Sequence, residues 1–154
     1  MKHSTGRAAT PTNRFVIALA VVVGTACAGF DGSLDPAFGL SDTVPDAPTL
    51  ARDVQPILDK RCAFGGCHSA ATRQAGLNLV DGSSMSALVR RPARLSPGDT
   101  LVIPGSSSRS WIVKMIGDNA AARGGLSRMP LAASPLTPNQ IATIARWIDR
   151  GAPP

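Results

Sequence analysis

The sequence predicts an all-α domain made of short helices and long loops. Apolar residues recur at helical spacing in three segments of the chain, beginning near residues 54, 109 and 138. No segment of useful length alternates apolar and polar residues as a half-buried strand would. Gly and Pro are frequent between the helical segments, where they favour loops. With 154 residues, the chain has room for a single such domain.

An export signal is predicted at the start of the chain. Residues 1–14 hold three basic residues and no acidic one, and residues 15–23 are an unbroken apolar run. Small residues follow, as at a signal-peptidase site, so residues 1–27 are predicted to be a signal peptide. A membrane-spanning helix needs about 20 apolar residues, so this run is too short for a permanent anchor. We therefore expect the mature protein outside the cytoplasm.

Cys27 leaves two interpretations of the cleavage site open. Ala26 and Ala28 have the spacing that an ordinary signal peptidase recognises. Small residues directly before a Cys also resemble a bacterial lipobox, although Gly24 stands where Leu is usual. Because Cys27 is the odd one of three cysteines, we favour lipidation of Cys27. The expected location is the periplasm, or the outer membrane or cell surface as a lipoprotein.

Residues 28–48 are predicted to be a flexible acidic linker. This stretch is rich in Gly, Pro and Ser, and four Asp are its only charged residues. Such a composition has no helical or strand periodicity and favours a solvated tether. The folded domain is therefore predicted to span residues 49–154.

The first helix of the domain is predicted from Val54 towards Cys62. Val54, Ile57 and Leu58 form one apolar stripe, and Asp53 is the expected N-cap. Pro56 falls in the first turn, where its missing N–H has no helical partner to lose.

The middle of the domain is predicted to be mostly loop. Residues 71–105 hold scattered small apolar anchors among Gly and Pro. A second helix is predicted over residues 109–116, with a Ser of 106–108 as its cap and Gly117 as its end.

The last helix has the clearest signals. Thr137 is the expected N-cap, Pro138 stands at the first helical position, and Gln140 completes a capping box. Its apolar face at helical spacing precedes Gly151, which is expected to end the helix. That face comprises Ile141, Ile144, Ala145 and Ile148.

The net charge of +6 gives little support for a nucleic-acid partner. Three of the 16 basic residues lie in the predicted signal peptide, which leaves 13 basic and 10 acidic residues after it. No basic run is interleaved with aromatic residues, so we expect no binding to nucleic acid. The one basic cluster, Arg90, Arg91 and Arg94, is expected to be solvated surface.

Cys62, Cys67 and His68 carry the chemistry of the sequence. Covalent attachment of haem needs two thiols that add across its vinyl groups and an imidazole beside the second thiol, commonly as Cys-x-x-Cys-His. Here four residues separate the two Cys, so a continuous helix would turn the thiols apart. Gly65 and Gly66 are expected to allow the bulge that brings them together.

The ligand on the other side of such an iron is not fixed by the residues alone. His68 is the only His after the predicted signal peptide, which leaves Met, water or an open site. Met85 is expected at a loop surface and Met115 on an apolar helix face as core filler. Met129 lies in an irregular loop between the later helices.

Residues 50–154 resemble the compact c-type cytochrome domain found in exported proteins of planctomycetes and myxobacteria. The resemblance covers nearly the whole domain in order. Its motifs are residues 53–58, 75–79, 102–105, 128–130, and 136–138 with 147–152. It implies a cytochrome c-like fold wrapped around haem c, with the first and last helices crossing and Trp147 packed at the crossing. It also implies Met129 as the distal iron ligand, opposite His68.

The expected function is electron transfer by a single-haem c-type cytochrome, not enzymatic catalysis. The expected partners are redox proteins, and a backbone carbonyl is expected to orient His68, with the 104–105 turn as a candidate. Two alternatives stay open: a gas- or peroxide-binding haem protein with an open distal site, and a haem-free interaction module closed by a Cys62–Cys67 disulfide. A zinc site has weaker support, because only three ligands are evident.

Overall fold

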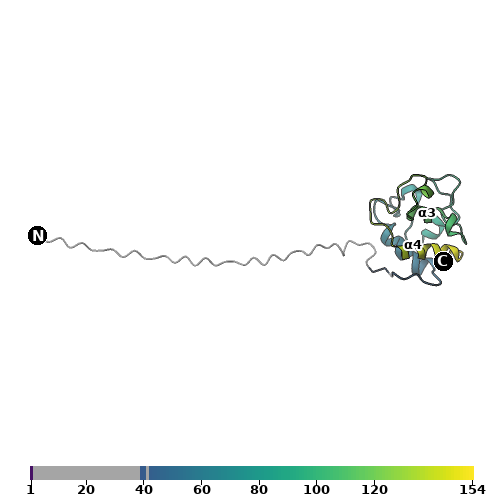
Figure 1. The fold of residues 1–154 in the computed structure, drawn as a ribbon, viewed down its shortest axis with the longest axis horizontal. Coiled ribbons are helices and arrows are strands. Elements are labelled where there is room, and N and C mark those ends of the chain that lie inside the picture. Colours follow the sequence, from purple (N-terminus) through teal and green to yellow (C-terminus); the bar gives the residue numbers. More distant parts are fainter. Residues whose placement is uncertain (2–38, 41) are drawn as a thin grey trace.

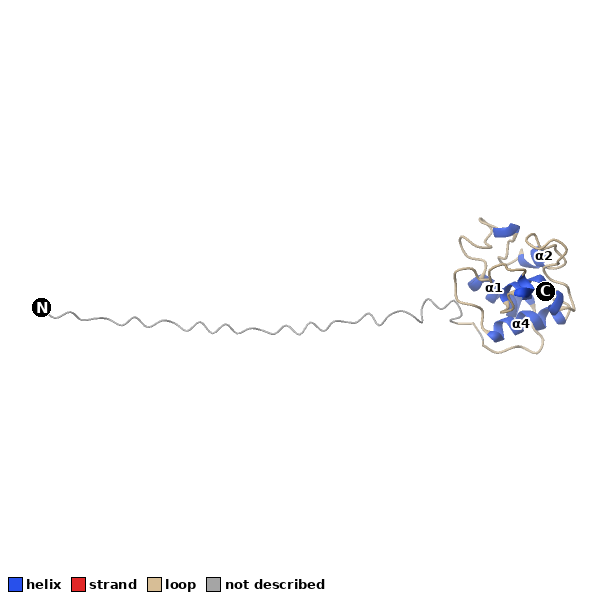
Figure 2. Cartoon of the chain, turned by 45° about the horizontal axis from the view of Figure 1, so that its top comes forward, coloured by secondary structure: helices blue, strands red, loops and turns tan. Residues whose placement is uncertain are grey.

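A computed structural model describes residues 1, 39–40 and 42–154, and these residues form helices without strands (Figures 1 and 2). The predicted signal peptide, Cys27 and most of the predicted linker lie outside them. None of the helices within the described ranges is long and apolar enough to cross a membrane. The helical elements are η1 (Leu50–Val54), α1 (Gln55–Arg61), η2 (Gln74–Gly76), α2 (Ser84–Leu88), η3 (Ser107–Arg109), α3 (Trp111–Ile116), η4 (Ala121–Arg123) and α4 (Pro138–Asp149).

The first helical segment begins earlier than predicted. A π-helical turn, η1, runs directly into α1, and Thr49 rather than Asp53 is its N-cap. The Thr49 hydroxyl accepts from the Arg52 N–H at 3.3 Å, and the Asp53 carboxylate accepts from the Thr49 N–H at 2.8 Å. The prediction of Asp53 as the cap was wrong, because its carboxylate reaches back to the cap residue instead.

The predicted loop over residues 71–105 contains α2, which the sequence analysis missed. Two isolated β-bridges, Val89–Val102 and Pro92–Thr100, then hold residues 89–102 together as a strap. The second predicted helix is present as η3 and α3 and ends before Gly117, as predicted. As predicted, a serine of 106–108 stands at its start: Ser106 is the N-cap of η3, although its side chain makes no capping bond. Ser110, the N-cap of α3, also makes no capping bond, and its hydroxyl donates to the Ser106 carbonyl at 2.8 Å.

The predictions for α4 are confirmed at both of its ends. Thr137 and Gln140 form the reciprocal capping box, with Pro138 in the first turn. Gly151 follows the C-cap with a φ of +93°, a conformation that favours Gly. The buried face includes Ile144, Trp147 and Ile148.

Part of the predicted linker lies against α4. The Asn139 amide donates to the Asp42 carbonyl at 2.7 Å, and the Arg146 guanidinium donates to the Pro45 carbonyl at 3.0 Å. Pro48 is fully buried. These contacts place residues 42–48 with the folded domain, so its boundary comes before the predicted residue 49.

One backbone carbonyl joins the beginning of the domain to its end. The carbonyl of Pro153 accepts from the Leu50 N–H at 3.0 Å and from the Trp147 indole N–H at 2.7 Å. The π-helical turn η1 packs on α4, and the Trp147 side chain is completely buried. η1, which precedes the predicted first helix, therefore contacts α4, and Trp147 belongs to the core. The crossing of the first and last helices stays a prediction.

Candidate functional site

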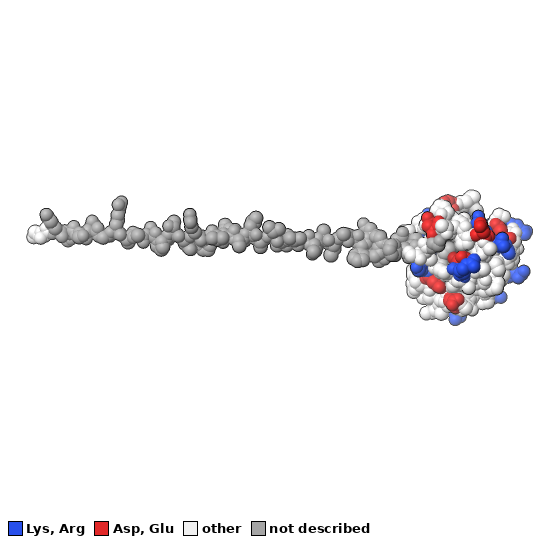
Figure 3. Space-filling view, turned by 90° about the horizontal axis from the view of Figure 1, so that it is seen from below, with Lys and Arg blue, Asp and Glu red and all other residues white. Residues whose placement is uncertain are grey.

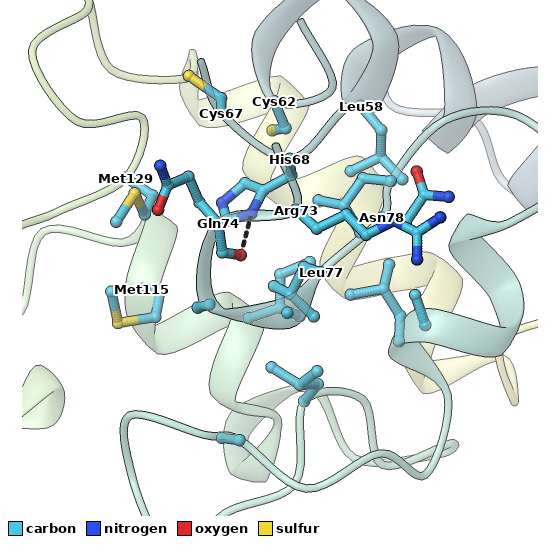
Figure 4. Close-up of a pocket in the computed structure, with 18 of the residues that line it drawn as sticks. Leu58, Cys62, Cys67, His68, Arg73, Gln74, Leu77, Asn78, Met115 and Met129 are labelled. Carbon is cyan, nitrogen blue, oxygen red and sulfur yellow. Dashed lines mark hydrogen bonds between the residues drawn. The ribbon is translucent and has the colours of Figure 1, made fainter. Parts of the chain in front are cut away.

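A cavity of about 860 Å³ opens on one side of the helices, within the size range of roughly 300–1,000 Å³ that is common for small-molecule sites. Its walls come from the end of α1, the loop after it, the strap, α3, α4 and the loop before α4. Most of the lining side chains are apolar. Cys62, Cys67, His68, Met115 and Met129 all line it (Figure 4).

The loop from Cys62 to His68 closes on itself by backbone hydrogen bonds. The His68 N–H donates to the Cys62 carbonyl at 3.0 Å, and the Cys67 N–H donates to the Phe64 carbonyl at 3.1 Å. The predicted bulge is present, and Gly66, with a φ of +83°, is the glycine that it requires. Both cysteines are free thiols and both face the cavity.

The Cys62 thiol is held in its protonated form. Burial raises the pKa of Cys62 to about 12, although the charge of Arg61 acts in the opposite direction. A protonated thiol is a poor nucleophile and a poor metal ligand. Burial therefore makes Cys62 a weaker nucleophile than an exposed thiol.

His68 is oriented by a backbone carbonyl, but not by the one expected. Its Nδ1 lies 2.9 Å from the carbonyl oxygen of Gln74. The 104–105 turn does not line the cavity, and its Gly105 N–H donates to the Ile148 carbonyl. A carbonyl can only accept, so Nδ1 carries the proton and Nε2 keeps its lone pair. Burial lowers the pKa of His68, against the effect of the Gln74 bond, so the ring is neutral at pH 7.

A strained turn presents the Gln74 carbonyl to His68. Arg73 and Ala75 have φ angles of +44° and +53°, and Gly76 has +76°. Positive φ is costly for residues other than Gly, and such strain persists only where neighbouring structure enforces it. Here the Gln74 N–H donates to the Cys67 carbonyl at 3.1 Å, which ties the turn to the cysteine loop. Sequence analysis missed Gln74, because only Gly76 signals this turn.

Met129 and Met115 lie together at the cavity wall. The Met129 N–H donates to the Met115 carbonyl at 2.8 Å, and both side chains line the cavity (Figure 4). Met115 is buried in the core, as predicted, and also faces the cavity. Met85 was expected at a loop surface, but it lies in α2 and is partly buried against the core.

Arg123 closes the loop that leads to Met129. Its guanidinium donates to the Gly117 carbonyl at 2.6 Å and to the Leu126 carbonyl at 3.1 Å, and its side chain is buried. An ion pair between Arg128 and Asp118 joins the same loop across its base. These contacts fix the chain immediately before Met129.

Comparisons with protein families, curated proteins and solved structures find no match for this chain. The function must therefore be inferred from the site itself. In the part of the chain that the structure describes, no group of three or more His, Cys, Asp or Glu is arranged to hold a metal ion.

The residues at the cavity fit a covalently attached haem in three respects. The space is large and mainly apolar, as the ring of haem requires. Two free thiols and one imidazole face it from a single loop. The imidazole is neutral with Nε2 unprotonated, the form that binds iron, and a thioether lines the same space.

Proposed function

We propose that this protein is an exported, single-haem c-type cytochrome that carries electrons between redox proteins outside the cytoplasm. One observation carries the proposal: free Cys62, free Cys67 and a carbonyl-oriented His68 line one apolar cavity. A structural histidine has no need of two thiols beside it. Each of these groups has a definite role in haem attachment.

The two thiols would hold the cofactor in place. Cys62 and Cys67 would each form one thioether bond to a vinyl group of the haem, the thiol hydrogen going to the other vinyl carbon.

His68 and Met129 are the residues that would hold the haem iron. The Gln74 carbonyl fixes the His68 ring and increases its basicity, as outer-shell partners of ligating histidines do. The haem supplies an iron that exchanges one electron, and a thioether ligand favours its reduced state. The chain would contribute a dry cavity and fixed ligand directions, which suit electron transfer with little rearrangement.

The cytochrome c-like arrangement and the location are part of this proposal. The contact of η1 with α4 around Trp147 supports such an arrangement. Export is supported by the basic and apolar start of the chain, and a lipid on Cys27 would tether the domain to a membrane.

The deciding experiment is intact-mass measurement after expression with a c-type haem maturation system. We expect one added haem that survives acid–acetone extraction, because thioether bonds resist it. The Cys62→Ser and Cys67→Ser variants should each lose part of this stability, and the double variant should lose all of it. A wild-type protein with a Cys62–Cys67 disulfide and no added haem would contradict the proposal.

A further inference from the structure

The charged side chains that line the cavity are all arginines. Arg61, Arg73, Arg91 and Arg94 line it, and no Asp or Glu among the described residues does. Elsewhere the two signs mix: on the face seen in Figure 3, acidic and basic side chains are interspersed. The charged side chains at the cavity are therefore all positive, unlike those on the face seen in Figure 3.

Two of these arginines have no partner within the folded domain. The side chains of Arg91 and Arg94 make no hydrogen bond or ion pair with any described residue, and both are exposed at the cavity's edge. By contrast, Arg73 donates to the Ala70 carbonyl at 2.9 Å. Arg91 and Arg94 thus keep all their guanidinium donors for a ligand or for water.

Arg94 is held close to the turn that orients His68. A Cβ atom at Gly76 would come within 2.9 Å of Arg94 Nη1 and 3.1 Å of Arg94 Cδ, so the side chain lies directly over this glycine. Gly76 ends the strained turn that presents the Gln74 carbonyl. The guanidinium and the imidazole therefore belong to one wall of the cavity.

We propose that Arg91 and Arg94 bind the carboxylates of the cavity's ligand, which are the two propionates of haem. This inference rests on the proposed function. The apolar interior accepts the ring, and the exposed arginines at the edge meet the anionic groups where these keep part of their hydration. The same two arginines were expected to be solvated surface, and their place at the cavity gives them this role instead.

The test measures the midpoint potential of the matured, full-length protein against pH. A propionate that ionises in the measured range makes the potential depend on pH, and a neighbouring cation moves that ionisation to lower pH. In the double variant Arg91→Gln/Arg94→Gln, we expect the pH-dependent step to move up by roughly one unit. We also expect a lower potential at pH 7, because two positive charges near the iron are lost.

The chain offers a matched control. Arg90 and Arg109 are also exposed, but neither lines the cavity. The double variant Arg90→Gln/Arg109→Gln changes the net charge equally and should leave the step where it is in wild type. Arg91→Lys/Arg94→Lys keeps both charges and should restore most of the wild-type pH profile.

The outcomes separate this inference from the function it rests on. Absence of haem from the matured wild type would overturn both. The wild type can bind haem while the pH-dependent step of the potential moves equally in the two glutamine double variants, Arg91/Arg94 and Arg90/Arg109, or in neither. That result would overturn only the role of Arg91 and Arg94. Loss of haem from the Arg91/Arg94 glutamine variant, with retention in the lysine variant and the control, would support it.

Discussion

At the scale of single residues, two thioethers share one wall of the cavity. Met115 is fixed in the core on α3, whereas Met129 lies on a loop and is only partly buried. Sequence analysis assigned the ligand role to Met129 through family resemblance and gave Met115 a packing role. Both side chains line the cavity in the structure. Substitution of each Met in turn can therefore show which of them is the iron ligand in the proposed function.

If the chain binds haem as proposed, Met129→Ala should remove a sulfur ligand from the iron, whereas Met115→Ala should not. A thioether on ferric haem gives a weak absorption band at the far-red end of the visible spectrum. We expect Met129→Ala to abolish this band, lower the midpoint potential and open the iron to carbon monoxide. Met115→Ala should leave the band in place and cost about 2–5 kcal/mol of stability, because it creates a buried cavity. The reverse pattern would assign the ligand to Met115.

Asp99 gives a residue-scale prediction for pH. Hydrogen bonds from Lys114 and then Ser96 lower its pKa, with Lys114 Nζ at 2.8 Å. A carboxyl whose pKa is lower in the folded state stabilises the fold above its unfolded pKa, near 3.9, and loses this contribution as pH falls through its folded pKa. Asp99→Asn should therefore be less stable than wild type at pH 7, and the difference should vanish in strong acid. Urea unfolding at both pH values measures this, and an equal difference at both would contradict it.

The cysteine and histidine side chains that line the cavity could be predicted from sequence, but the groups that hold them in place could not. Cys62, Cys67 and His68 could be found in the sequence because the expected attachment of haem depends on their side chains and their spacing. The group that orients His68 is a backbone carbonyl, which any residue at position 74 would provide. Its position depends on positive φ angles at Arg73 and Ala75, residues whose types do not favour them. Sequence patterns carry no signal for such enforced strain.

At the scale of elements, helix ends were predicted correctly where the capping residues interact within one turn of the chain. The capping box of α4 was predicted because Thr137 and Gln140 interact within one turn. The cap of η1 was misplaced because two polar residues, Thr49 and Asp53, stand one turn apart and either can begin a helix. The short helix α2 has only five residues, too few to show a periodic apolar face.

The loop between α3 and Met129 provides a prediction for Arg123. Arg123→Ala removes two hydrogen bonds to carbonyls and should cost about 1–3 kcal/mol of stability, since the groups left behind are partly buried. The loop would then hold Met129 less firmly, so the far-red band should weaken at a lower temperature than in wild type while the haem stays attached. Arg109→Ala, an exposed change outside the site, is the control. An unchanged band over the full temperature range would exclude a positioning role for Arg123.

At the scale of the whole molecule, the core lies where η1, α3 and α4 meet. Trp147 is at its centre, completely buried, with its indole N–H bonded to the Pro153 carbonyl. The helical class of the fold was predicted correctly from spacing alone. The packing of residues 42–48 on α4 was not predicted. Their contacts with α4 depend on backbone carbonyls in a Pro- and Asp-rich stretch whose composition resembles a linker.

Trp147→Ala should have the largest effect of the core substitutions. Removal of a fully buried Trp costs about 3–5 kcal/mol, which is a large fraction of the stability of a small domain. Urea unfolding of the unmatured protein measures this, with Arg150→Ala as an exposed control expected within about 0.5 kcal/mol of wild type. A loss below about 1 kcal/mol would show that the ring is not central to the core.

The Pro153 carbonyl also determines when the two ends of the domain can come into contact during synthesis of the chain. One of its two hydrogen bonds joins Leu50 to Pro153, residues that leave the ribosome about a hundred positions apart, and the other joins Trp147 to Pro153. Until residue 153 has emerged, the first helix lacks this fastening and Trp147 lacks its acceptor. The contact between η1 and the end of the chain can therefore form only after nearly the whole chain has been synthesised.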